Sequence, residues 1–269
     1  MLDILHYDLL DFVTSYGVRI PSLRVTYQLF GKPLGTAPVV VVNHAFTGNS
    51  QVAGENGWWA EAIGAAKVIN TDIYTVVAFN IPGNGFHARE EDMITNYQHW
   101  AAVDVARLFN IALKEHLGLN SVFALVGCSL GGGIAWEMAA LAPDYFQQLV
   151  IVAADWKATD WIIGNCLLQE QILKNSTHPL HDARLHAMLC YRTPQSLKMK
   201  FERTTHLPTQ LYNVESWLLH HGEKLNKRFS LSAYKLMNQL VKTIDISKDR
   251  GSFAEAVAPI TAHITIVST

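Results

Sequence analysis

The amino-acid sequence predicts an α/β fold in which a mostly parallel sheet carries an inserted helical cap. Short apolar runs rich in β-branched and aromatic residues recur along the chain, and helical patterns separate most of them. Strands that alternate with helices pair in parallel through right-handed crossovers. The alternation stops after Ala154, because residues 156–251 contain helical segments and no convincing strand, and strand character returns only close to Thr269.

The expected strands cover residues 23–30, 39–42, 74–79, 122–126, 149–152 and 263–267. A helical pattern over residues 100–117 ends at Gly118, and a second over residues 134–141 ends before Pro143. The first two strands are expected to form an antiparallel hairpin at one edge of the sheet. These elements divide the chain into a core (residues 1–155), a helical cap insertion (residues 156–251) and a return to the core sheet (residues 252–269).

Composition limits the class of protein. A chain of 269 residues with 49% apolar content can bury one large core, and it needs no second globular domain. The net charge of −2 provides no basic field for nucleic acid or an anionic membrane, and no apolar stretch approaches the length of a membrane span. The N-terminus lacks a basic start and a cleavage site, and three cysteines cannot make a full disulfide framework. We expect a cytoplasmic protein.

The strongest chemical signal is the segment GCSLG at residues 127–131, which fits the nucleophile-elbow pattern. Glycines two residues before and after Ser129 let a strand and a helix approach closely around a strained turn. The alternative is a structural glycine-rich turn. Cys128 is a rival nucleophile, but Val126 and Leu130 would crowd a turn centred on it. A buried structural role is therefore expected for Cys128.

A second element follows the expected strand at residues 39–42. The segment NHAFTG at residues 43–48 opens the loop that faces the elbow in this architecture. An oxyanion hole needs two N–H donors, and we expect the backbone amides of Phe46 and Leu130 to supply them. Losing one such donor costs on the order of 3 kcal/mol of transition-state stabilisation. The alternative for this segment is a plain tight turn.

Over nearly its whole length the chain resembles the homoserine O-acetyltransferase family of the α/β-hydrolase superfamily. The matching segments are TYQLFG (26–31), NHAFTGNSQVAG (43–54), GWWAEAIGAAKVINTDIYTVVAFN (57–80), GCSLGG (127–132), DARLHAMLCYR (182–192) and KRFSLSAYKLMNQLVKTID (227–245). The resemblance implies that Ser129 is the acylated nucleophile and that Phe46 and Leu130 form the oxyanion hole. It also implies that Arg184 and Tyr191 bind the carboxylate of a homoserine-like amino acid, and that two copies form a dimer through their caps.

The spacing of Arg184 and Tyr191 agrees with that role. The two residues are seven apart, so a cap helix would place them on one face together with Met188. A guanidinium group offers a two-pronged grip on a carboxylate that lysine cannot copy. The alternative is a surface ion pair between Arg184 and Asp182 or Glu202.

The chain departs from the family pattern at three places. Residues 81–87, IPGNGFH, form a shorter loop than the family's and look more like a simple hydrolase. Cys128 and Leu130 stand where glycine and methionine are usual. The family's acid and histidine follow its last strands, so the resemblance places both beyond Thr269, and we expect the chain to be a fragment that lacks the C-terminal part of its core. If Thr269 is the true end, an inactive truncated domain is expected.

No replacement for the missing base is expected inside the chain. Asp155 follows the strand at residues 149–152, where it could orient a histidine, but no histidine is suitably placed. His263 is expected at the entering end of its strand, and His44 belongs to the loop at residues 43–48. The remaining candidates lie on the cap: His178, His181, His186, His220 and His221. A serine hydroxyl without an adjacent base is a poor nucleophile at neutral pH.

We expect neither a metal nor a tightly held cofactor. His181 and His186 are five residues apart, which differs from the helical spacing of zinc ligands, and no phosphate-binding loop or dinucleotide motif occurs. Coenzyme A would therefore enter as a substrate. The resulting expectation is an acyltransferase that moves an acyl group, acetyl from acetyl-CoA, through Ser129 to the hydroxyl of homoserine or a similar amino acid. The alternative is a serine esterase or thioesterase of the same fold.

Overall fold

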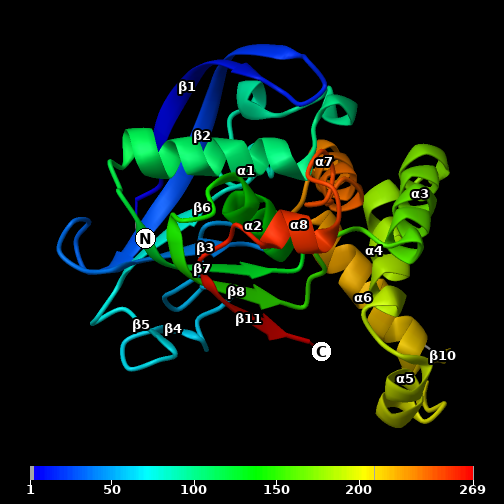
Figure 1. The fold of residues 1–269 in the computed structure, drawn as a ribbon. Helices are drawn as coiled ribbons and strands as arrows, with labels where there is room; N and C mark the ends of the chain where they lie inside the picture. Colours follow the sequence, from blue (N-terminus) through cyan, green and yellow to red (C-terminus); the bar gives the residue numbers. More distant parts are fainter. Residues whose placement is uncertain (1–2, 209, 269) are drawn as a thin grey trace.

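The computed structural model describes residues 3–208 and 210–268, and in them seven strands form one sheet in the order β1-β2-β6-β3-β7-β8-β11 (Figure 1). The strands are β1 (Leu5–Val13), β2 (Arg19–Gly31), β3 (Val39–Asn43), β6 (Thr75–Phe79), β7 (Val122–Cys128), β8 (Phe146–Val152) and β11 (His263–Val267). Two-residue strands form two small separate sheets: β4 (Ile63–Gly64) with β5 (Ile69–Asn70), and β9 (Thr205–His206) with β10 (Leu211–Tyr212). The predicted mostly parallel α/β fold is confirmed.

The central strands β3, β6 and β7 are apolar because both faces of the sheet are covered. β3 has the sequence VVVVN, and every residue in it is buried, as is every residue of β6. Val41, Val77 and Leu125 face the core that contains α1 (Ala102–Ile111) and α2 (Leu130–Leu141). On the opposite face, Val40 and Val42 pack against the irregular segment at residues 50–74. Continuous Val-rich runs of this kind are typical of buried parallel strands.

The predicted hairpin between residues 23–30 and 39–42 is wrong. β2 pairs antiparallel with β1 along one side and with β6 along the other, whereas β3 lies between β6 and β7 and is parallel to both. The apolar run of β3 belongs in the middle of the sheet, where both faces are covered, whereas a long apolar strand at the edge would offer its unpaired backbone groups to other chains. The actual hairpin partner of β2 is β1, whose mixed sequence LHYDLLDFV gives no clear strand pattern.

The predicted helices are present with shifted ends. α1 covers the middle of the expected segment 100–117 and continues into a π-helical turn, η3 (Ala112–His116), before Gly118. α2 begins four residues earlier than the apolar pattern suggests, directly after Ser129, and it ends at Leu141 ahead of Pro143. Two short 3-10 turns, η1 (Glu90–Asp92) and η2 (Tyr97–His99), precede α1.

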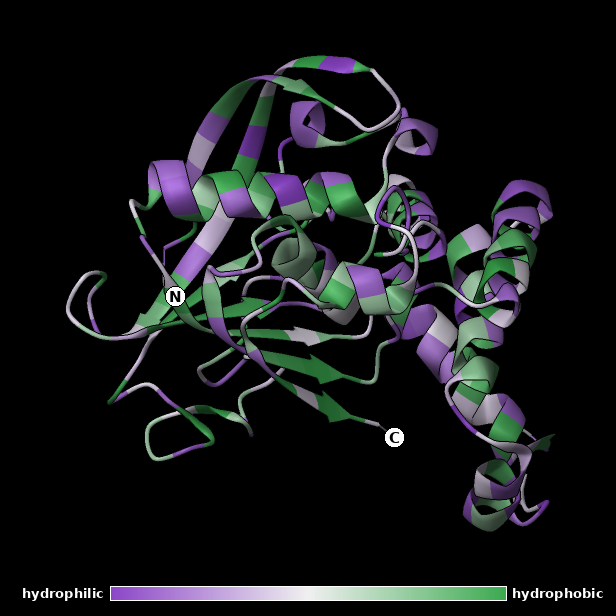
Figure 2. Ribbon diagram, in the orientation of Figure 1, coloured by the Kyte–Doolittle hydropathy of each residue, from purple (hydrophilic) through white to green (hydrophobic). Residues whose placement is uncertain are grey.

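Between β8 and β11 the chain is mainly helical and extends from one end of the sheet (Figure 1). The helices are α3 (Asp160–Asn175), α4 (Pro179–Cys190), α5 (Pro194–Phe201), α6 (Asn213–Asn226), α7 (Leu231–Lys242) and α8 (Phe253–Val257). Hydrophobic positions are continuous in the central strands and interspersed with polar ones on α3 to α6 (Figure 2). α7 differs from α3 to α6, because its Leu236, Met237 and Leu240 belong to the main core. The division at residues 155 and 251 stays a prediction.

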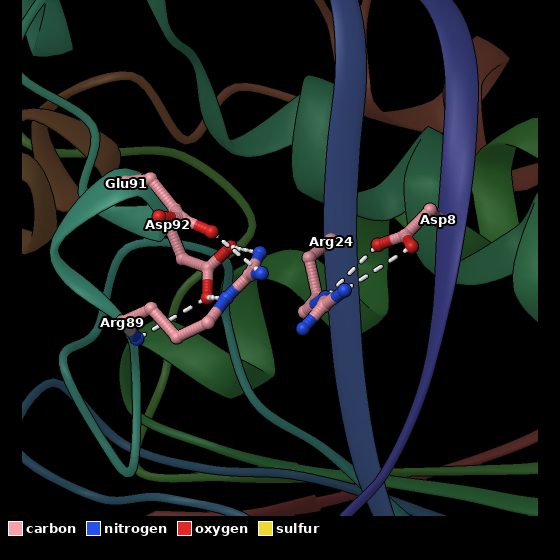
Figure 3. Close-up of polar contacts among 5 residues, drawn as sticks. All are labelled: Asp8, Arg24, Arg89, Glu91 and Asp92. Carbon is pink, nitrogen blue, oxygen red and sulfur yellow. Dashed lines mark hydrogen bonds and ion pairs between the residues drawn. The ribbon is translucent and has the colours of Figure 1, made fainter.

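An exposed charge cluster lies where the β1–β2 hairpin meets η1 (Figure 3). Arg24 Nε is 2.9 Å from Asp8 Oδ1, across the two strands. Arg89 contacts Asp92 Oδ1 at 2.6 Å and Glu91 Oε1 at 2.5 Å. The hydrogen bond from Arg89 lowers the pKa of Asp92. Three carboxylates outnumber two guanidinium groups, so the cluster leaves no excess positive charge for an anion. Exposed pairs of this kind contribute little to stability.

Candidate active site

Ser129 lies in a sharp turn between β7 and α2. Its backbone has φ 53° and ψ −123°, a conformation that a residue with a Cβ rarely adopts. The Ser129 N–H donates to Val152 O at 2.9 Å, and its C=O accepts from Gly132 N at 2.8 Å and Gly133 N at 3.1 Å. These bonds hold a strained residue in place, and Ser129 is exposed at the end of the sheet. Backbone strain of this type clusters at functional sites.

The two glycines of the elbow are required by close backbone contacts. A Cβ on Gly127 would lie 2.3 Å from Gly131 O, and a Cβ on Gly131 would lie 2.4 Å from Asn43 O and 2.5 Å from His44 O. These are contacts with backbone atoms that cannot rotate away. The start of α2 therefore packs closely against the end of β3, and the two glycines of GCSLG make that packing possible.

The loop at residues 44–48, which we call the oxyanion loop, leaves the sheet beside the elbow. Asn43 pairs with Gly127 in register, so β3 and β7 end at the same edge. Within residues 3–208 and 210–268, no acceptor is bonded to the N–H of Phe46 or to the N–H of Leu130, the first residue of α2. Helix N-termini present such free N–H groups as a rule. Both predicted oxyanion donors are thus available for a ligand.

His44 and Gly48 together fix the orientation of the Phe46 amide, because Ala45 O accepts from His44 Nδ1 and also from Gly48 N at 2.9 Å. His44 is 1% exposed, and its Nδ1 donates to Ala45 O at 2.8 Å. Its Nε2 accepts from Ile81 N at 3.0 Å and lies 3.3 Å from Asn84 Nδ2. Ala45 O and the N–H of Phe46 belong to one planar trans peptide, so a bond that holds the carbonyl also aims the amide in the opposite direction. Sequence reasoning placed His44 in this loop without finding this role.

Burial lowers the pKa of His44 to about 4, and the bond to Ala45 opposes this effect only in part. Unfolded chains protonate histidine near 6.5, so between pH 6.5 and about 4 the unfolded state binds more protons, and folding stability falls as the pH is lowered. We expect the wild type to lose about 2 kcal/mol more unfolding free energy than His44→Gln between about pH 7 and about pH 5. Urea denaturation at both pH values measures this difference. A ring resonance of His44 that titrates near 6.5 would contradict it.

Arg184 and Tyr191 lie together, as the sequence predicts. Arg184 is on α4, and Tyr191 caps the C-terminus of that helix; the Arg184 Cζ atom is 5.5 Å from the centre of the Tyr191 ring. Among the described residues no carboxylate pairs with Arg184, because Asp182 is bonded instead to His181 and Ser176. The alternative of a surface ion pair between Arg184 and Asp182 or Glu202 is therefore not seen in this part of the chain. Arg184 keeps an uncompensated positive charge.

Tyr234 on α7 connects helices α3 and α4 to the oxyanion loop. Its ring centre is 4.8 Å from that of Phe46, and its hydroxyl donates to Gln169 Oε1 at 3.1 Å. Gln169 Nε2 in turn donates to Ala183 O at 3.2 Å, one residue before Arg184. Burial raises the pKa of Tyr234, an effect that the nearby Arg184 charge opposes. A chain of contacts thus connects α4, which carries Arg184, to the loop that carries Phe46.

The other candidate groups are less suited to the chemistry. Burial raises the pKa of the Cys128 thiol, which disfavours the thiolate that a cysteine nucleophile needs. His263 pairs with Gln148 at the entering end of the sheet, far along the strand from Val267, as predicted. Asp155 is exposed and accepts from Trp156 N. No side chain among residues 3–208 and 210–268 is hydrogen-bonded to the Ser129 hydroxyl.

Metal and membrane features give no further candidate. In the part of the chain that the structure describes, no group of three or more His, Cys, Asp or Glu side chains could hold a metal ion. The same residues contain no helix long and apolar enough to cross a bilayer.

The fold, the strained turn at Ser129 and the N–H groups of Phe46 and Leu130, which have no acceptor among the described residues, indicate an α/β-hydrolase. Comparison with known proteins agrees with this class. Residues 38–206 match the family model described as alpha/beta hydrolase fold. The homoserine O-acetyltransferase of Salinibacter ruber is 30% identical to this chain, over 91% of this chain and 77% of that protein. The chain therefore belongs to the homoserine O-acetyltransferase family of the α/β-hydrolases, and it is an enzyme of this acyltransferase group.

Solved structures agree at the level of the fold. The homoserine O-acetyltransferase from Staphylococcus aureus has a TM-score of 0.83 and 24% identity, and the match covers 99% of this chain and 79% of that chain. Esterase E22 has a TM-score of 0.84 and 17% identity, and the match covers 100% of this chain and 85% of that chain. The same architecture thus occurs in a protein named as a transferase and in a protein named as an esterase.

Proposed function

We propose that this protein transfers an acyl group, acetyl from acetyl-CoA, through an ester on Ser129 to the hydroxyl of homoserine or a similar amino acid. The observation that carries the proposal is the exposed Ser129 at φ 53° beside two backbone amides without acceptors among the described residues. An acyl group on this hydroxyl would place its developing oxyanion near the N–H groups of Phe46 and Leu130. Coenzyme A acts as a substrate in this proposal, without a held cofactor.

The reaction follows two steps. The Ser129 oxygen attacks the thioester carbon, the tetrahedral oxyanion is held by the two amides, and the thiolate of coenzyme A leaves. The acceptor hydroxyl then attacks the serine ester and releases Ser129. Each attack requires a base that takes the hydroxyl proton and returns it to the leaving group.

We assign the carboxylate of the amino-acid acceptor to Arg184, with Tyr191 beside it. The guanidinium group lacks a carboxylate partner among the described residues, and a bound amino acid would supply one. Helices α3, α4, α6 and α7, which contribute residues to the apolar cluster against which Phe46 packs, would also exclude water, which transfer to an alcohol requires.

Arg184→Lys tests this assignment. We expect the KM for homoserine to rise by about tenfold or more, because lysine cannot make the bidentate contact, while acylation of Ser129 by acetyl-CoA changes little. Steady-state kinetics with homoserine varied at saturating acetyl-CoA measure the first effect. Arg192→Lys is the matched control, because Arg192 is exposed and contacts Ser196 Oγ at 3.3 Å and the centre of the Trp217 ring at 5.8 Å. An unchanged KM for homoserine in Arg184→Lys would contradict the assignment.

The direct test of the proposed function is release of free thiol from acetyl-CoA by the purified protein, with and without homoserine. Release that depends on homoserine supports the transferase. Release without any acceptor identifies a thioesterase or esterase, the second candidate, which the short loop at residues 81–87 and the exposed Ser129 favour. No release under either condition would overturn both.

A further inference from the structure

The oxyanion loop is held from two sides, and each side fixes a different peptide plane. On the core side, Ala45 O accepts from His44 Nδ1 at 2.8 Å and from Gly48 N at 2.9 Å, and these two bonds set the plane that contains the Phe46 N–H. From the cap, Arg228 binds the loop two residues later, with Nη1 donating to Thr47 O at 3.1 Å and Nη2 lying 3.5 Å from Thr47 Oγ1. Phe46 lies between these two points of attachment. A shift of either one rotates or moves its amide.

Arg228 connects the α6–α7 segment to the oxyanion loop. It lies in the short connection between α6 and α7, next to Phe229, whose ring centre is 6.3 Å from that of Tyr234. Arg228 and Phe229 line a cavity of about 220 Å³, whose other walls include Thr47 and Asn84. The guanidinium group therefore spans from the cap helices to the loop that carries the proposed oxyanion donor.

No carboxylate competes for Arg228 among the residues that the structure describes. Desolvation of the guanidinium group and the charge of Arg184 lower the pKa of Arg228. Arg184 has no acidic partner either within the described ranges. The two arginines differ in their contacts, because Arg228 is directly bonded to Thr47 O, whereas Arg184 lies against the Tyr191 ring on its own helix.

We propose that Arg228 is a positioning residue that couples the cap to the oxyanion hole by holding the main chain of the oxyanion loop. This inference rests on the proposed function for its kinetic consequence, and on the geometry alone for its structural one. Arg228 does not touch the reacting atoms in this account. It keeps the Phe46 amide aimed while Arg184 binds the acceptor.

The experiment compares Arg228→Gln with Lys227→Gln. Lys227 is the adjacent residue, carries the same charge and pairs with Glu223 on the surface, so it controls for charge and for local sequence. In Arg228→Gln we expect kcat for acyl release to fall about tenfold or more, with the KM for homoserine unchanged. Arg228→Lys should recover part of the loss, and added guanidinium should partly rescue Arg228→Ala.

A second measurement needs no activity. Amide hydrogen exchange in the peptide that contains residues 44–49 should become several-fold faster in Arg228→Gln and stay at the wild-type rate in Lys227→Gln. Unchanged exchange overturns the inference even if the wild type is active. A raised KM for homoserine at constant kcat also overturns it, because Arg228 would then be a carboxylate ligand. If the wild type transfers no acyl group, the proposed function fails, and the exchange result alone decides this inference.

Discussion

Replacing Ser129 by alanine is expected to lower kcat for acyl release from acetyl-CoA by at least about 10,000-fold. Removal of a serine nucleophile eliminates the covalent route and leaves only the contribution of binding and of the oxyanion hole. Alanine can adopt the same strained backbone at φ 53° as serine, so the fold is expected to be kept. Thiol release under saturating substrate measures the change, and circular dichroism verifies folding.

Two related variants sharpen this prediction. Cys128 is the rival nucleophile, but it lies at the end of β7 and not in the strained turn. Cys128→Ala should therefore retain most of the activity. Ser129→Gly should be more stable than Ser129→Ala by roughly 1 kcal/mol, since glycine adopts positive φ without strain. Activity that persists in Ser129→Ala and disappears in Cys128→Ala would move the nucleophile by one residue and refute the elbow assignment.

Gly131→Ala is expected to cost about 2–3 kcal/mol of stability and about 100-fold or more in kcat. The added Cβ would lie 2.4 Å from Asn43 O and 2.5 Å from His44 O, so β3 and α2 must separate by about 1 Å to restore van der Waals contact. That separation moves the oxyanion loop away from Leu130, and a displacement of this size in a catalytic group can cost about 100-fold in rate. Denaturant unfolding and steady-state kinetics measure the two effects.

Gly164→Ala is the matched control. Gly164 is also helical, but it is exposed on α3 with no heavy atom within 4 Å of an added Cβ among the described residues. The same substitution should therefore stabilise the protein by about 0.5–1 kcal/mol through helix propensity and leave kcat unaltered. If Gly131→Ala resembled Gly164→Ala in both measurements, the close packing of the elbow against β3 would be wrong.

Local sequence patterns predict which segments form strands, and they fail on how some of those strands pair. The apolar runs that form β2, β3, β6, β7, β8 and β11 are all visible in the sequence. β1 is missed because its polar and apolar residues do not alternate cleanly. The antiparallel pairing assigned to β3 follows from chain order, although its four consecutive valines are more typical of a central parallel strand.

Local sequence patterns likewise predict some residues of the functional site and miss others. Ser129 could be predicted because the strained turn requires glycines at fixed positions, and Arg184 and Tyr191 could be predicted as neighbours from helical spacing. The roles of His44 and Arg228 could not, because their partners lie far away in the sequence. His44 meets Ile81 across 37 residues, and Arg228 meets Thr47 across 181 residues. No local sequence pattern predicts contacts over such separations, and a single histidine or arginine can have many other structural roles.

The most direct test of the central claim is to identify the acylated residue. The purified protein is mixed with radiolabelled acetyl-CoA without acceptor, quenched within seconds, digested and sequenced by mass spectrometry. We predict one acetyl group on Ser129, which is lost when homoserine is added before the quench. Acetylation of a different residue, or transfer to homoserine at full rate with Ser129 never labelled, would contradict the account.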